Sequence, residues 1–178
     1  MIYFTADEHY GHTNIIKFCN RPFKDVLDMN EQLIQRHNDV VKPFDTIYHI
    51  GDFSLKIAPE KVPVIIARLN GYHYFITGSH DRWINKSTSE GMHHKVLGPI
   101  WEGVIDNRHV FLSHYPHLSW PRSYHGSLHF HGHTHGKVAH GRNRYDVGVD
   151  VNSFAPISLE AIVKYLLDHD LLHKGVGI

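Results

Sequence analysis

The order of apolar segments in the first half of the chain constrains its fold more than any other feature. Residues 1–6, 45–50 and 72–77 are rich in apolar and aromatic side chains, a pattern typical of buried strands. Between them, residues 28–42 and 59–69 keep helical spacing of apolar positions. Strands that alternate with helices pair in parallel through helical crossovers. The sequence therefore predicts an α/β fold.

The second half of the chain changes to short strands joined by turns. Strands are expected over residues 96–106, 109–113, 128–131 and 145–149. Asn107-Arg108 is a turn-like pair, so the first two of these strands are predicted to form an antiparallel hairpin. Ser158 is the expected N-cap of a closing helix over 159–169. No repeat or linker interrupts the chain, which predicts one domain over residues 1–178.

Composition excludes several classes of protein. Lys plus Arg and Asp plus Glu number 18 each, so no broad basic surface for long nucleic acid is indicated. Cys19 is the single cysteine, which excludes a disulfide scaffold, and we expect its thiol to be buried. The first residues do not resemble a signal peptide, and no apolar run is long enough to cross a bilayer. We therefore expect a cytoplasmic protein without a membrane partner, and the sequence leaves its oligomeric state open.

Aspartate and histidine side chains follow the predicted strands where each strand ends. Five segments carry them, namely Asp7 with His9, Asp52, Ser79 to Asp81, His114, and His133 with His135. Ligands of open α/β sheets bind beyond the carboxyl ends of strands, so we expect these segments to meet at one edge. Alternate residues of an extended segment face the same way, so Asp-x-His and His-x-His can each direct two ligands at one site. One such pair alone is weak evidence for a metal site, but five segments with aspartate or histidine after successive strands predict one.

The residue types indicate which metals such a site would take. The chain has 19 histidines, and histidine is the commonest metal ligand. Carboxylates with imidazoles suit Mn, Fe, Zn or Ni better than Ca or Mg, and the lack of a cysteine cluster argues against structural zinc. Gly51, Gly78 and Gly132 directly precede the key residues, where glycine permits tight backbone conformations.

Taken in order, these segments resemble the motifs of the calcineurin-like metallophosphoesterase superfamily. The matching positions are Asp7-x-His9, Gly51-Asp52, Gly78-Ser79-His80-Asp81, His114 and Gly132-His133-x-His135. The resemblance spans most of the chain. It implies a single metallophosphoesterase domain, a four-layer α/β/β/α sandwich of two mixed β-sheets flanked by helices.

The resemblance also implies a role for each residue. The ligands of two divalent ions would be Asp7, His9 and His135 for the first, His114 and His133 for the second, and Asp52 as a bridge. Manganese is favoured, with Fe, Zn or Ni as alternatives. His80 would face the substrate phosphate and protonate the leaving oxygen or stabilise the transition state. Asp81 would support His80 through a hydrogen bond.

Ser79 departs from the family motif, which has asparagine after the glycine. That asparagine offers its amide oxygen to the second metal, whereas the serine side chain is shorter and its hydroxyl a poorer ligand. Three interpretations follow: the second metal binds weakly, a water replaces the amide oxygen, or the residue is an engineered change. We favour weaker binding of the second metal at Ser79.

Hydrolysis of phosphate esters is the chemistry implied by such a centre. Two cations about 3.5–4 Å apart neutralise phosphoryl oxygens and lower the pKa of a bridging water, and the resulting hydroxide attacks phosphorus in line. A phosphodiesterase of nucleotide-like or cyclic phosphates is preferred to a phosphomonoesterase, because the chain has no obvious cap domain. A catalytically weakened binding or scaffold protein on the same fold and a metal-dependent hydrolase of other bonds are the alternatives.

Residues that bind the substrate are less strongly indicated. Arg21 lies in a rigid turn before a proline and could bind phosphate with its two-pronged guanidinium. Arg122 and Trp120 belong to a segment that could form a wall for a phosphate and a base. It is equally plausible that Trp120 only packs and that both arginines are solvated. His12 and Asn14 are further candidates near the first motif.

Overall fold

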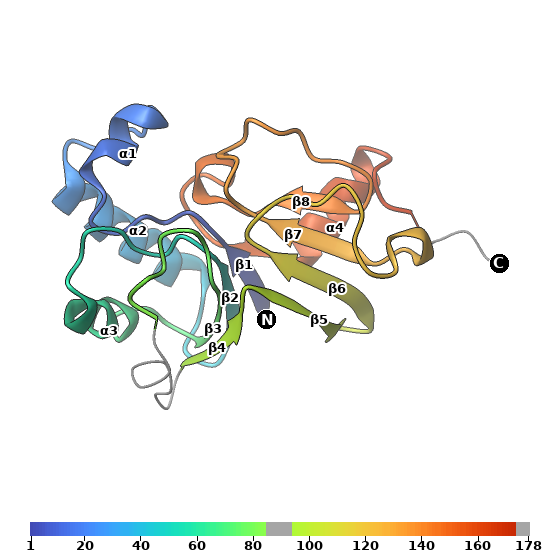
Figure 1. Cartoon of the computed structure of the whole chain (residues 1–178), viewed down its shortest axis with the longest axis horizontal. Coiled ribbons are helices and arrows are strands. Elements are labelled where there is room, and N and C mark those ends of the chain that lie inside the picture. Colours follow the sequence, from blue (N-terminus) through green and yellow to red (C-terminus); the bar gives the residue numbers. More distant parts are fainter. Residues whose placement is uncertain (85–93, 174–178) are drawn as a thin grey trace.

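Two mixed β-sheets, flanked by helices, form the protein (Figure 1). The computed structural model describes residues 1–84 and 94–173. The first sheet has the order β4-β3-β2-β1-β9, with strands β1 (Ile2–Thr5), β2 (Thr46–Ile50), β3 (Tyr72–Ile76), β4 (His94–Gly98) and β9 (Ile157–Ser158). The second has the order β5-β6-β7-β8, with strands β5 (Ile100–Ile105), β6 (Arg108–Ser113), β7 (Leu128–His131) and β8 (Arg144–Asp146).

The parallel pairing predicted for the first half of the chain is confirmed. Strand β2 pairs in parallel with β1 on one side and with β3 on the other. Only β9 runs antiparallel, along the free edge of β1, and makes this sheet mixed. The helices are α1 (Thr13–Phe18), α2 (Val26–Val40), α3 (Val62–Ile66) and α4 (Leu159–Asp168). Segments containing α2 and α3 supply the crossovers between the three parallel strands.

Helix ends agree with the sequence pattern to different degrees. Ser158 caps α4 as predicted, because its hydroxyl accepts a hydrogen bond from the Ala161 amide. The helix expected over 59–69 is shorter, a 3₁₀ turn (Pro59–Lys61) followed by the five residues of α3. Helix α1 was not expected, because six residues are too few to show helical periodicity.

Within the described parts of the chain, no helix combines the length and apolar character needed to cross a bilayer.

The strand expected over residues 96–106 is in fact two strands in different sheets. Strand β4 ends at Gly98, whose φ of +100° lies in the region that favours glycine, and Pro99 has no backbone N–H with which to continue the ladder. Strand β5 then forms the antiparallel hairpin with β6. The hairpin turns at Asp106 and Asn107, both at positive φ, one residue earlier than expected.

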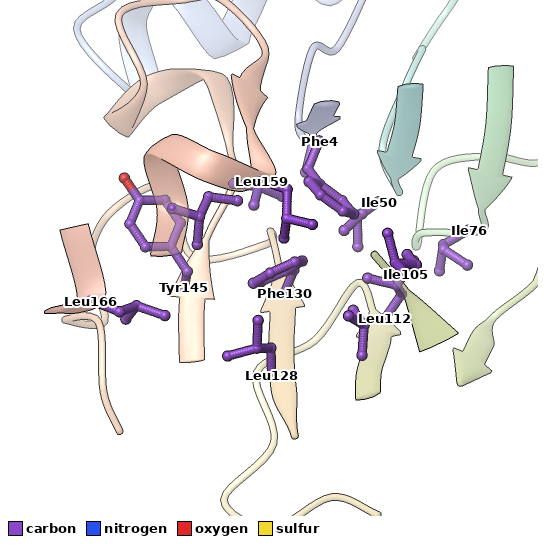
Figure 2. Close-up of a cluster of buried hydrophobic side chains, with 14 residues drawn as sticks. Phe4, Ile50, Ile76, Ile105, Leu112, Leu128, Phe130, Tyr145, Leu159 and Leu166 are labelled. Atoms are coloured by element: carbon purple, nitrogen blue, oxygen red, sulfur yellow. The ribbon is translucent and has the colours of Figure 1, made fainter. Parts of the chain in front are cut away.

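Apolar side chains from both sheets meet in one central cluster (Figure 2). Phe4 of the first sheet and Phe130 of the second meet edge to face, with ring centroids 4.7 Å apart. Helix α4 adds Leu159 and Leu166 to the same cluster. Two mixed sheets that pack on a shared core are consistent with the expected sandwich, and helix α4 packs its apolar face into the same core.

A second cluster fills the space between the first sheet and the helices that cover its other face. Met29 and Leu33 of α2 and Phe75 of β3 are buried there. Beside it lie buried histidines with partners inside the protein. The His37 Nε2 donates to the Asn70 carbonyl at 2.8 Å.

Candidate metal centre

Residues that follow five strands meet where the carboxyl ends of the two sheets adjoin. The Asp7 amide donates to the Gly51 carbonyl, which ties the end of β1 to the end of β2. The Asp7 carboxylate accepts from the His133 amide at 2.8 Å, which joins β1 to the loop after β7. The Gly132 amide donates to the His114 carbonyl at 3.1 Å. Both sheets therefore contribute to one site.

Two groups of side chains at this site could each hold a metal ion. The first triad is Asp7, His9 and His135, and the second triad is Asp52, His114 and His133. In each triad the three ligand atoms lie within 4.8 Å of one another. The Asp52 Oδ2 lies 3.2 Å from the His114 Nε2 and 3.8 Å from the His9 Nε2, so this carboxylate of the second triad also approaches the first triad.

Burial of unpaired polar atoms fits a bound cation. Both ring nitrogens of His9 are buried, and neither has a hydrogen-bond partner within residues 1–84 and 94–173. Buried nitrogen atoms are nearly always paired, and a metal ion would supply the missing partner of His9. Burial also raises the pKa of the Asp7 carboxyl to about 7, against the opposing charges of His114 and His135, because its anion is poorly solvated. The residues present therefore suit a divalent cation.

Backbone conformation directs these side chains toward the site. Five of the six triad residues have a φ in the left-handed region, which residues other than glycine adopt uncommonly. They are Asp7 (59°), His9 (54°), Asp52 (57°), His133 (68°) and His135 (47°). Such strain is found at functional sites, where the surrounding structure holds it in place.

Two glycines allow the loops to approach the carboxylates closely. A methyl group on Gly78 would lie 2.3 Å from the Asp52 Oδ1, and one on Gly132 would lie 2.6 Å from the Asp7 Oδ2. Neither glycine has a positive φ. Close approach, rather than an unusual backbone angle, therefore explains glycine at these two positions.

Arg21 does not face a substrate, so its expected role is wrong. Its Nε and Nη2 each lie 2.8 Å from an oxygen of the Asp150 carboxylate. The other N–H groups are directed at the carbonyls of Asp7 (2.7 Å) and Glu8 (2.9 Å) and at the sulfur of Met29. All five donors of the guanidinium thus have partners inside the protein, and the side chain is fully buried.

Asp150 is a site residue that the sequence pattern did not reveal. Its carboxylate accepts from the His135 Nδ1 at 2.7 Å and binds Arg21 at the same time. A carboxylate on the second nitrogen of a metal-binding histidine fixes the ring orientation and raises its basicity. Cys19, His135 and Asp150 also lie close enough to form a third group, but the Nδ1 of His135 is already bonded to Asp150. Cys19 is half-buried at the edge of this site rather than buried as expected.

Asp81 supports the backbone around Asp52 and not the imidazole of His80, which corrects another expectation. Its carboxylate accepts hydrogen bonds from the amides of Asp52 (2.7 Å), Phe53 (2.9 Å) and Gly78 (2.8 Å), and from the Trp83 indole. These bonds fill both oxygens of a buried carboxylate. The ring of His80 instead lies at the rim of the site, with 41% of its side chain exposed and its Nε2 3.9 Å from the Asp52 Oδ2.

Ser79 contacts the Asp52 carboxylate of the second triad. Its hydroxyl donates to the Asp52 Oδ2 at 3.1 Å, and the His80 amide donates to the Oδ1 at 2.9 Å. Burial raises the pKa of Asp52, but the hydrogen bond and charge of His114 outweigh it and hold that pKa below its usual range. Ser79 therefore adds one hydrogen bond to a carboxylate whose ionised form His114 stabilises.

A cavity of about 580 Å³ opens onto both triads. His12, Ser79 and His80 line it together with the triad residues His9, Asp52, His133 and His135. Asn14 is exposed and is not among the lining residues.

Arg122 lies elsewhere, in a hollow beside Glu102 and Val104, which argues against the expected contact with a phosphate at the triads. The Trp120 indole is bonded to Ser127, which supports the alternative that this side chain packs. Arg122 and Trp120 therefore do not supply the expected wall of the site, whereas the ring of Tyr115, in the same segment, contacts that of His133 with centroids 4.5 Å apart.

The fold and site define an α/β protein of two mixed sheets with a candidate centre for metal ions. The chain is 34% identical to the uncharacterized protein MJ1445 of Methanocaldococcus jannaschii, over 98% of this chain and 92% of that protein. It therefore belongs to the same family as MJ1445. No model of a protein family matches it.

Solved structures support the fold. The protein of unknown function AQ665 from Aquifex aeolicus superposes with a TM-score of 0.70 at 24% identity, over 93% of this chain and 98% of that one. Yfce, a phosphoesterase from E. coli, superposes with a TM-score of 0.38 at 17% identity, over 83% of this chain and 77% of that one. The likeness to AQ665 shows a shared fold.

Proposed function

We propose that this protein is a metal-dependent phosphoesterase that acts on small phosphate esters, with phosphodiesters of the nucleotide or cyclic type preferred. The observation that carries the proposal is the pair of triads, which share one cavity and approach each other at the Asp52 carboxylate. Asp7, His9 and His135 would hold one divalent ion, and His114 and His133 a second, with Asp52 between them. Manganese suits these carboxylates and imidazoles.

Bound ions would neutralise charge on the phosphoryl oxygens and make water nucleophilic at neutral pH. The protein's own part is to hold the ester in the cavity and to supply a proton. His80 belongs to neither triad, and its exposed ring lines the cavity near Asp52. These observations support a role for His80 as the donor of a proton to the leaving oxygen.

A panel of esters assayed with added Mn²⁺ tests this function. We expect hydrolysis of bis(p-nitrophenyl) phosphate, slower hydrolysis of p-nitrophenyl phosphate, and loss of both activities on removal of metal with a chelator. Hydrolysis of p-nitrophenyl acetate alone would favour a hydrolase of other bonds. Metal binding without hydrolysis of any ester would favour a binding or scaffold protein.

Replacement of Ser79 by asparagine is expected to tighten the binding of the second metal ion. The longer side chain would bring an amide oxygen to the second triad, where serine now donates to Asp52. An added ligand worth on the order of 1 kcal/mol would raise affinity several-fold. Titration with Mn²⁺ followed by calorimetry measures this change. Unchanged metal content and unchanged rate in Ser79→Asn would show that Ser79 does not limit metal binding.

Replacement of Asp150 by asparagine is expected to weaken metal binding at the first triad by about 10–100-fold. The change removes the negative charge that orients His135 and compensates the buried Arg21. Competition with a fluorescent chelator measures the affinity. Asp39→Asn is the matched control, because Asp39 is exposed on α2. Equal affinities in the two variants would exclude an orienting role for Asp150.

A further inference from the structure

Besides the triad residues, the cavity is lined by Ile15, Phe18, Leu55 and Lys137, and we call this part the outer cavity. Its side chains are mostly apolar, whereas those of the triads are metal-binding types. Helix α1 contributes Phe18 and Ile15 to the outer cavity, and Leu55 adds a third apolar side chain. Phe18 is 67% exposed. The ring contacts that of His12 edge to face, with centroids 6.3 Å apart. An aromatic ring is thus presented to the cavity and to solvent at once.

A cation completes this part of the cavity. Lys137 lines the same space, two residues after His135. It is exposed, and among the described residues its ammonium group has no ion-pair or hydrogen-bond partner. Among the lining residues that the structure describes, Asp52 of the second triad is the only carboxylate. The outer cavity therefore combines an apolar aromatic surface with an unpaired positive charge.

We infer that the outer cavity binds the organic part of the substrate, a planar ring that stacks on Phe18 and carries a further anionic group near Lys137. This inference rests on the proposed function, because it assigns the substrate class of the same site. A cavity of about 580 Å³ falls within the range of sites for small ligands. Bases stack on aromatic side chains whatever their sequence, and an exposed lysine attracts phosphate as a point charge. Nucleotides are a substrate class that combines a planar ring with anionic groups.

Binding to the Mn²⁺-loaded protein tests the inference with three probes. We expect AMP to bind on the order of tenfold more tightly than ribose 5-phosphate, since the two differ only in the base. Phe18→Ala should remove most of that difference. The matched control is Phe44→Ala, because Phe44 is 86% exposed and does not line the cavity. Lys137→Ala should weaken ADP more than AMP, because ADP carries the additional phosphate.

The outcomes separate this inference from the function on which it rests. Equal affinities for AMP and ribose 5-phosphate, or equal AMP affinities for Phe18→Ala and Phe44→Ala, would overturn the inference even if phosphate esters are hydrolysed. If no ester is hydrolysed and none of the three probes binds, the proposed function fails and the inference falls with it. Calorimetry supplies the affinities without any need for turnover.

Discussion

Replacement of His80 by alanine is expected to lower kcat by about 10²–10⁴-fold while metal affinity is retained. His80 lies at the rim of the cavity and belongs to neither triad, so its loss removes no metal ligand. A leaving alkoxide needs a proton, and an exposed imidazole near Asp52 can supply it. Measurements of kcat with Mn²⁺ and of bound metal give the two quantities separately.

The dependence on the leaving group makes this prediction about His80 specific. p-Nitrophenolate leaves readily without a proton, whereas an alkyl alcohol does not, so His80→Ala should slow alkyl esters far more than nitrophenyl esters. His125→Ala is the control, because His125 is an exposed histidine remote from the cavity lining. Loss of metal in His80→Ala would mean that His80 is a ligand, and an equal loss for both classes of ester would exclude proton donation.

The free energy of unfolding is expected to fall steeply as the pH drops below about 6.5. Burial lowers the pKa of His37 to about 3 and that of His129 to about 3, because the charged imidazolium is poorly solvated inside the protein. The unfolded chain binds protons near pH 6.5, and the folded chain does not. The contribution of these two histidines to stability is therefore full above this pH and is lost as the pH falls toward 3. At pH 5 each histidine accounts for about 2 kcal/mol.

Urea unfolding of the chelator-treated protein at pH 8, 6 and 5 measures this loss without a contribution from bound metal. A combined loss of about 4 kcal/mol from His37 and His129 is large beside the total stability of a typical domain. His37→Gln should reduce the slope of stability against pH by about 1.4 kcal/mol per pH unit between pH 6 and 4. An unchanged slope would show that His37 is protonated in the folded protein.

Much of the site's location could be predicted from residue order. The first three strands are apolar and alternate with helical segments, so they had to pair in parallel and end at the same edge. Asp7 and Asp52 each lie two residues after the end of one of the first two strands and therefore meet there. The local sequence pattern is sufficient to predict the position of these two aspartates, because the direction of a strand determines where the residues after it lie.

Other parts of the fold depended on conformations that pattern does not encode. Residues 96–106 are apolar enough for one strand, but the positive φ of Gly98 divides them between two sheets. Helix α1 has only six residues, yet it places Phe18 on the cavity. Short segments carry too few apolar positions to distinguish one period from another.

The sequence by itself determined which aspartates and histidines reach the shared edge of the two sheets. Tertiary structure alone decided which side chains support them. Arg21 and Asp150 are 129 residues apart and meet only because the packed loops bring them together. Asp81 bonds to the amides of Asp52 and Gly78 rather than to His80, and the close approach of Gly78 to Asp52 brings these two amides together. The partner of a polar side chain follows from three-dimensional packing and the need to satisfy buried groups, neither of which is written in local sequence.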